Sequence, residues 1–209
     1  MNLSFLEAFL LMFIAVDPIM IVPIFANLTG GFSRDQYRKV YIKAFLVSTL
    51  LLVTFWLFGE SVLGHFGIRM TSFKIIGGLF LIAIAYNMLF DKRSERKTNT
   101  AEEAIDDNTI DDIAVFPLSI PLIAGPASLA TAVLLGEGKG DTFESYMLSL
   151  GPILLVSIIT LIAMIATSKI SKFLGPTILT VTEKLLGLLL GALAIEFIIE
   201  GIETTFNLV

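Results

Sequence analysis

The sequence predicts an all-α, polytopic membrane protein with six transmembrane helices, arranged as two inverted three-helix repeats with broken first and fourth helices. Three observations predict this fold: the composition, the spacing of apolar runs and an internal repeat. Of the 209 residues, 56% are hydrophobic and 16% are charged, and the mean hydropathy is +0.88. Soluble domains average about 45–50% apolar and about 25% charged residues, so this composition argues against a water-soluble domain.

Six apolar runs have the length of a membrane-spanning helix, which needs about 20 residues to cross a bilayer core. The first run has no basic start, and it carries an acidic residue and two prolines in its middle, so it fits a cleaved signal peptide poorly. The six runs cover residues 5–28, 41–63, 72–90, 113–135, 146–167 and 178–202.

The basic residues predict how these spans are oriented. Eleven of the 14 lysines and arginines fall in the loops of one side, which the positive-inside rule places in the cytoplasm. Both termini are therefore predicted to be non-cytoplasmic, in a multi-pass protein of the plasma membrane. The polar residues 91–112 are predicted to form a cytoplasmic linker, with a docking segment as the alternative. They separate a first repeat, residues 1–90, from a second, inverted repeat, residues 113–209.

The internal repeat relates the third span to the sixth and the first span to the fourth. Lys-Ile-Ile-Gly at 74–77 returns as Lys-Leu-Leu-Gly at 184–187, and Asp-Pro at 17–18 resembles Phe-Pro at 116–117. An odd number of spans in each repeat inverts the second copy, which is typical of secondary transporters. Small residues at 77–78 and at 187 and 191 predict close packing between the third and sixth spans.

Prolines interrupt the first and fourth spans. They stand at Pro18 and Pro23 in the first span and at Pro117, Pro121 and Pro126 in the fourth. Proline removes an amide donor and clashes with the preceding turn, so both helices are predicted to break. Freed backbone groups must be buried in protein or line a wet cavity. A kink satisfied by neighbouring helices is the alternative, and the corresponding positions of the two clusters favour the cavity.

These segments resemble the MarC family of six-helix membrane proteins. The resemblance rests on residues 17–23, 116–126 and 183–201 and extends over nearly the whole chain. It implies a membrane transporter, because some members are described as transporters of small neutral amino acids such as glycine and alanine, and the family is grouped with LysE-type exporters. The family commonly has glycine where this chain has Met20 and Ala127, which leaves the expected fold unchanged and puts the substrate in doubt.

Asp17 is the first candidate for an ion-binding or substrate-binding residue. An ionised acid near the bilayer centre is costly, so we expect Asp17 to face the bundle interior or water. It would bind a proton, a cation or a substrate ammonium. The alternative is a structural role, in which Asp17 caps the half-helix that starts at Pro18; the two roles are compatible.

Glu196 is the second acidic candidate. We expect it to be buried in the sixth span, where a neutral glutamic acid would carry a proton or serve as a static hydrogen-bond donor. The repeat matches it to Tyr86, with Asn87 as a polar neighbour. Glu200 and Glu203 are expected to be interfacial and solvated.

The second break contributes polar groups of a different kind. Amides at the start of the half-helix after Pro126 carry partial positive charge, which suits a substrate carboxylate. The ammonium of a zwitterionic amino acid would then lie against Asp17 or backbone carbonyls. The further candidates around the two breaks are Pro18, Pro23, Asn27, Ser119, Pro121, Gly125 and Ser128. Trp56, Tyr41 and Tyr146 are expected to face lipid at the membrane interface.

The leading hypothesis is secondary transport of small neutral amino acids, coupled to a proton or sodium ion and without a cofactor. A channel-like pore for a small solute or ion, and a non-transporting scaffold subunit, are the alternatives. We do not expect an enzyme, because the sequence shows no recognisable pair of a nucleophile and a base. The chain has no cysteine and one histidine, so no metal site is expected, and a net charge of −5 disfavours nucleic acid. The expected partners are the lipid bilayer and a small solute, and a homo-oligomer is left open.

Overall fold

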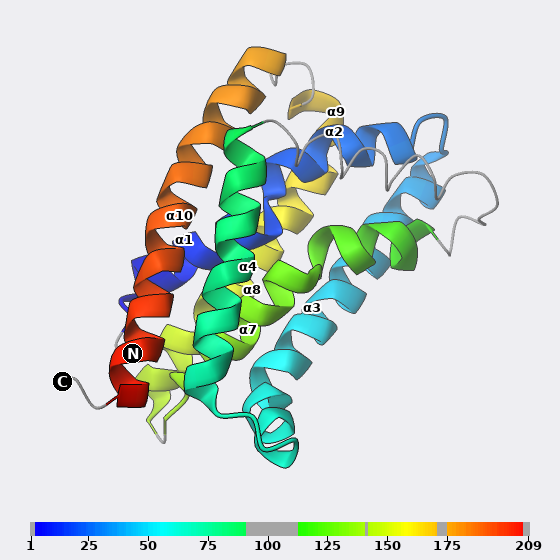
Figure 1. Cartoon of the computed structure of the whole chain (residues 1–209). Helices are drawn as coiled ribbons and strands as arrows, with labels where there is room; N and C mark the ends of the chain where they lie inside the picture. The colour runs from blue at the N-terminus through cyan, green and yellow to red at the C-terminus, as the bar shows by residue number, and fades with distance from the viewer. Residues whose placement is uncertain (1–2, 91–112, 141, 171–174, 207–209) are drawn as a thin grey trace.

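In the computed structural model, the described residues, 3–90, 113–140, 142–170 and 175–206, form helices joined by short connections (Figure 1). These ranges contain no strand, so the predicted all-helical class is confirmed. The predicted linker, residues 91–112, lies outside them. The helices are α1 Phe5–Val16, α2 Pro18–Leu28, α3 Arg34–His65, α4 Met70–Leu89, η1 Ala114–Ile123, α7 Pro126–Glu137, α8 Phe143–Ile165, α9 Thr167–Ile170 and α10 Pro176–Phe206.

The six predicted spans have counterparts in these helices. Five segments are long and apolar enough to cross a membrane: α1 together with α2, then α3, α4, α8 and α10. The bent pair η1–α7 is the sixth when it is counted as one span. The α1–α2 segment is the most buried of these five spans, so most of its side chains pack against other helices.

Helix α3 begins at Arg34, before the predicted span, because a reciprocal cap fixes its start. The Ser33 N–H donates to Gln36 Oε1 (2.8 Å), and the Gln36 N–H donates to Ser33 Oγ (3.4 Å). The helix then runs for 32 residues, about 48 Å at 1.5 Å per residue, which exceeds a bilayer core of about 30 Å. Hydropathy therefore located the membrane-buried part of α3 and missed its polar first turns.

Helices α4 and α10 pack side by side and antiparallel (Figure 1). A Cβ on Gly78 of α4 would meet the Ala194 carbonyl oxygen of α10 at 2.7 Å, and a Cβ on Gly187 would meet Met88 Cβ at 2.8 Å. The predicted close packing of the third and sixth spans is therefore confirmed. Antiparallel packing is what an inverted repeat requires, and the repeat itself stays a prediction.

The core consists of two hydrophobic clusters. The larger one joins α1, α2, α3, η1, α7 and α8. The smaller one seats the α4–α10 pair on the rest of the bundle, where Leu11 and Ile14 of α1 and Leu134 of α7 pack against Leu81 and Phe197. Helices α1 and α7 thus lie between the two parts of the molecule.

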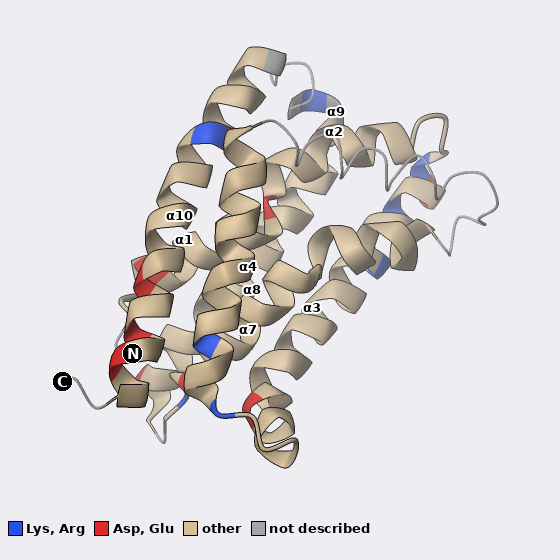
Figure 2. Ribbon diagram, in the orientation of Figure 1, with Lys and Arg blue, Asp and Glu red and all other residues tan. Residues whose placement is uncertain are grey.

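Charged side chains separate along the bundle (Figure 2). Basic residues at the start of α3, in α9 and near the start of α10 lie away from the two chain ends. Acidic residues gather at the end where α10 finishes. We call this second end the terminal end. Leu3, which is close to the N-terminus, lies there and lines one small cavity together with Glu137.

Candidate functional site

Asp17 forms the break between α1 and α2. Its backbone is left-handed (φ 59°, ψ 66°), and its N–H donates to the Phe13 carbonyl (2.8 Å) where α1 ends. Its Oδ1 accepts from the Met20 N–H (3.3 Å), and Pro18 takes the first helical position of α2. Asp17 is only 2% exposed. The expected capping role and interior position are confirmed; binding of an ion or substrate stays a prediction.

Pro23 does not take part in this break. It lies inside α2, which continues through it to Leu28. The first interruption is therefore limited to Asp17, rather than extending over residues 17–23 as the proline spacing had indicated.

The second break separates η1 from α7, whose axes differ by 61°. Phe116 and Ile120 have extended backbones (both φ −127°, ψ 122°), as expected for residues that precede proline. The predicted break in the fourth span is therefore confirmed. It begins within η1 and ends at Gly125, directly before Pro126 starts α7.

Gly125 is required here by a close approach of the backbone. A Cβ at this position would overlap the Pro121 carbonyl oxygen, so a side chain would force the turn apart. Gly125 also precedes Pro126 as Asp17 precedes Pro18, with a helix starting at each proline. Asp17 and Gly125 are thus alike in preceding the proline that starts a helix, and the repeat alignment of Asp17 with Phe116 stays a prediction.

Three hydroxyl side chains are buried around the second break. Ser119 Oγ donates to the carbonyls of Ala114 (2.7 Å) and Ala44 (3.2 Å), which ties η1 to α3. Ser128 and Thr131 lie one turn apart on α7 and are 1% and 0% exposed. Thr131 Oγ1 has no hydrogen-bond partner among the residues that the structure describes. Thr131 was not among the residues predicted from the sequence, although it lies three residues after Ser128 and this spacing was a signal for it.

The two breaks lie in the same core. Val16 and Ile21 flank the first break, Ile123 and Ala124 flank the second, and all four belong to the larger hydrophobic cluster. Asp17 lines neither the cavity beside Pro126 nor the small cavity beside Leu3. Apolar side chains pack around both breaks, and the polar cavity expected there stays a prediction.

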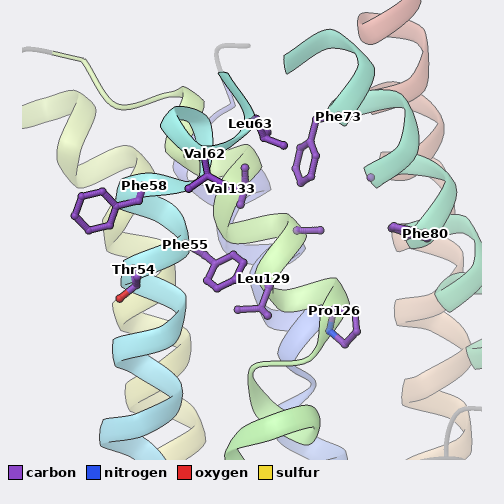
Figure 3. A pocket seen from close by; sticks show the side chains of 13 residues that line it. Thr54, Phe55, Phe58, Val62, Leu63, Phe73, Phe80, Pro126, Leu129 and Val133 are labelled. Atoms are coloured by element: carbon purple, nitrogen blue, oxygen red, sulfur yellow. The ribbon is translucent and has the colours of Figure 1, made fainter. Parts of the chain in front are cut away.

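A cavity of about 410 Å³ borders the second break at Pro126 (Figure 3). Pro126 reaches it from the start of α7, Phe55 and Phe58 from α3, and Phe73 and Phe80 from α4. Its lining is almost entirely apolar. Such a lining suits hydrocarbon and would not hold a charged amino acid.

Three predicted site residues lie away from the breaks. Asn27 and Glu196 are exposed on the surface of the chain, and Asn87 is half-buried. The predicted burial of Glu196 is wrong because the buried face of α10 follows Leu190, Ala194 and Phe197, and Glu196 lies off that stripe. Its role as a buried proton carrier is therefore not supported by its position.

An ion cluster that the sequence did not reveal lies at the terminal end. Lys74 Nζ is 2.7 Å from Glu137 Oε2 and 3.2 Å from Glu200 Oε1. The Lys74 side chain is 4% exposed, and those of the two glutamates are 28% and 24% exposed. Glu200 is thus half-buried in an ion pair, and not solvated as expected. A lysine within an apolar span was the available signal, because a charge there needs a partner.

Trp56 was expected to face lipid and is instead 3% exposed. It packs against α7, where a Cβ on Gly136 would overlap the Trp56 carbonyl oxygen. Its ring also meets the Tyr146 ring of α8 (5.8 Å between centroids). The close approach of α3 and α7, which Gly136 permits, removes Trp56 from the membrane surface.

Comparison with known proteins covers nearly the whole chain. The family model described as "MarC family integral membrane protein" matches residues 3–206. A UPF0056 membrane protein of Archaeoglobus fulgidus is 33% identical over 95% of this chain and 92% of its own length. The UPF0056 membrane protein YvbG of Bacillus subtilis is 33% identical over 99% of this chain and 98% of its own length.

A UPF0056 membrane protein of Buchnera aphidicola is 36% identical over 91% of this chain. No solved structure matches the chain. The family match spans both broken helices and every predicted span, and the relatives have nearly the same length. The chain therefore belongs to the MarC family of integral membrane proteins.

Proposed function

We propose that this protein is a secondary transporter of small neutral amino acids such as glycine or alanine, coupled to a proton or sodium gradient. The observation that carries the proposal is the pair of helix breaks within one buried core. Each break frees backbone groups and starts a new half-helix at a proline. Secondary transporters bind their substrates where such interrupted helices meet near the middle of the membrane.

A zwitterion matches the difference between the two breaks. Helix α7 starts at Pro126 with no side-chain cap, so its first-turn amides and positive dipole end suit a carboxylate. Asp17 and the carbonyls at the end of α1 suit an ammonium group. The buried hydroxyls of Ser128 and Thr131 add neutral hydrogen-bonding groups close to the start of α7. Apolar side chains pack around both breaks, so we propose that α7 or η1 moves when the substrate binds.

Counterflow in reconstituted vesicles tests this proposal. Purified protein is placed in liposomes loaded with unlabelled glycine or alanine, and entry of the radiolabelled amino acid is followed. We expect saturable, transient accumulation above that in empty liposomes, because a carrier exchanges its substrate across the membrane. Flux equal to that of empty liposomes contradicts the proposal. Non-saturable flux without counterflow supports the channel alternative in its place.

Thr131→Val separates a substrate role from a structural one. The valine has nearly the same shape, and no described residue loses a hydrogen bond to the hydroxyl. We therefore expect unchanged or slightly higher thermal stability and a rise of about tenfold in the glycine concentration that half-saturates transport. Thr160→Val on α8 is the control, since its hydroxyl bonds the Val156 carbonyl (2.8 Å) within its own helix. Equal transport by both variants and the wild type removes Thr131 from the site.

A further inference from the structure

The apolar cavity beside Pro126 fills the space between α3 and α4, with α7 as its third wall (Figure 3). Helix α7 approaches α3 closely, because a Cβ on Gly59 would meet Val133 Cγ2 at 2.5 Å. Its contact with α4 is looser, because a Cβ on Gly77 would meet only Leu134 Cδ1, at an ordinary 3.4 Å. Helices α3 and α4 follow each other in the chain and diverge from their connection (Figure 1), which leaves the cavity between them.

This cavity lies at the depth of the membrane. Both α3 and α4 are long and apolar enough to cross a bilayer, and the cavity is lined by residues within their apolar runs, 41–63 and 72–90. Phe58, Val62 and Phe80 line it and are still 54%, 51% and 53% exposed, so the cavity is accessible from outside the protein. In a bilayer core, the medium that reaches such a surface is the hydrocarbon of lipid chains.

The lining of the cavity selects hydrocarbon over a polar ligand. Among the described residues that line it, Thr54 has the only polar side chain. Its hydroxyl donates to the Leu50 carbonyl (2.7 Å) within its own helix. A polar ligand would therefore lose hydrogen bonds to water without replacing them. The volume of about 410 Å³ is well above the roughly 150 Å³ of an apolar cavity that takes up benzene, so a segment of an acyl chain fits.

The connection between α3 and α4 offers a partner for the polar end of a lipid. Phe66 and Ile68 of this connection are 77% and 44% exposed, and exposed apolar side chains at the end of a span are typical of the membrane interface. Arg69 follows them and is exposed. It lies one turn before Phe73, a residue of the cavity wall whose N–H donates to the Arg69 carbonyl (3.1 Å). Arginine binds phosphate through two parallel donors.

We propose that this cavity binds one acyl chain of a phospholipid and that the phosphate of the same lipid lies against Arg69. The chain fills the space between α3 and α4 and packs on Pro126 and Leu129, so it supports the first turn of α7 from the membrane side. The site is separate from the proposed substrate site, since Ser128 and Thr131 do not line the cavity. Its occupation requires no transport.

Native mass spectrometry of the full chain counts the bound lipid. Protein purified in detergent and stripped of lipid is titrated with dipalmitoyl phosphatidylglycerol, and its thermal unfolding is followed in parallel. We expect saturable binding of one lipid per chain and an unfolding temperature that rises with lipid concentration, because a ligand of the folded state stabilises it. Absence of both effects in the wild type overturns the proposal, whatever the variants below do.

Ala130→Leu tests whether the acyl chain lies in the cavity. Ala130 is half-buried in the α7 wall, and leucine puts a larger apolar side chain where the acyl chain would lie. We expect a loss of lipid affinity of about tenfold or more, because some methylene groups of the lipid stay outside, with the lipid-free protein as stable as the wild type. Ala192→Leu, on an exposed position of α10, is the matched control and keeps wild-type affinity.

Two outcomes for Ala130→Leu overturn the proposal. Several weakly bound lipids, equal in number in the variant and the wild type, show a general lipid layer rather than a site. A wild-type dimer that Ala130→Leu dissociates shows that a second copy of the chain covers the cavity in place of lipid.

Arg69→Gln tests the position of the phosphate. Loss of the guanidinium removes a charged partner of the headgroup and leaves the cavity intact, so we expect about threefold to tenfold weaker binding that depends less on salt. The control is Glu60→Gln, which removes an exposed charge of opposite sign from α3 at the same end and keeps at least wild-type affinity. Wild-type affinity and salt dependence of Arg69→Gln overturn the placement of the phosphate at Arg69.

Discussion

Asp17 ends one helix and begins the next, and both tasks depend on its residue type. Its left-handed backbone is unfavourable for most side chains and tolerated best by glycine, asparagine and aspartate. Its carboxylate also accepts the Met20 N–H, which has no partner within α2. A single residue therefore turns the chain and satisfies a backbone donor inside the buried core.

Replacing Asp17 separates its structural role from its charge. Asp17→Ala loses the cap and places alanine in the left-handed region, so we expect a loss of about 2 kcal/mol of stability. Asp17→Asn keeps both features and should unfold close to the wild-type temperature. Thermal unfolding in detergent measures both variants, with the exposed Asp35→Ala as control. If Asp17→Asn is stable and its counterflow is lost, the charge acts on the substrate; wild-type stability of Asp17→Ala contradicts the structural role.

Helices α4 and α10 show how two apolar helices associate when lipid removes the hydrophobic driving force. Their contact depends on close van der Waals packing, for which small residues let the backbones approach. Gly78 lies against Ala194 and Ile198, and Gly201 lies against the Thr71 carbonyl. At the other end of the contact, Gly187 lies against Met88. Glycine thus stands at both ends of the pair.

For two glycines of the α4–α10 pair, we expect opposite outcomes from the same substitution to alanine. A Cβ on Gly78 would come within 2.7 Å of a backbone oxygen, whereas a Cβ on Gly191 would meet Ala85 Cβ at 3.6 Å, an ordinary contact. We expect Gly78→Ala to cost about 1–3 kcal/mol and Gly191→Ala to be neutral or slightly stabilising. Unfolding of both variants in one detergent checks this difference. Equal stability of the two variants shows that the helices do not pack as closely as described.

The whole molecule has one basic end and one end at which both chain termini lie (Figure 2). Cytoplasmic loops of membrane proteins carry an excess of lysine and arginine. We therefore propose that the terminal end faces away from the cytoplasm.

Cysteine labelling checks this orientation with little background, since the chain has no cysteine of its own. Thr204 of α10 and Lys39 of α3 are both exposed and lie toward opposite ends of the bundle. With a membrane-impermeant maleimide, we expect Thr204→Cys to react in intact cells and Lys39→Cys to react only after the membrane is opened. The reverse pattern shows that the chain has the opposite orientation.

The sequence by itself determined the helical class, the six apolar segments and the presence of two breaks. Each of these is local. A run of about 20 apolar residues spans a bilayer wherever it lies in the fold, and a proline disrupts its own turn. The helix cap formed by Asp17 could also be predicted from the sequence, because an acidic residue before a proline is a common helix start.

Only the tertiary structure decided which face of each helix is buried and where each break begins and ends. Residues of α4 and α10 are apolar almost all round, so no stripe in the sequence shows how each helix is rotated about its axis. That rotation turned Glu196 outward and Lys74 inward, and the approach of α7 at Gly136 buried Trp56. Packing between distant segments sets these positions, and a membrane span carries little local information about its partners.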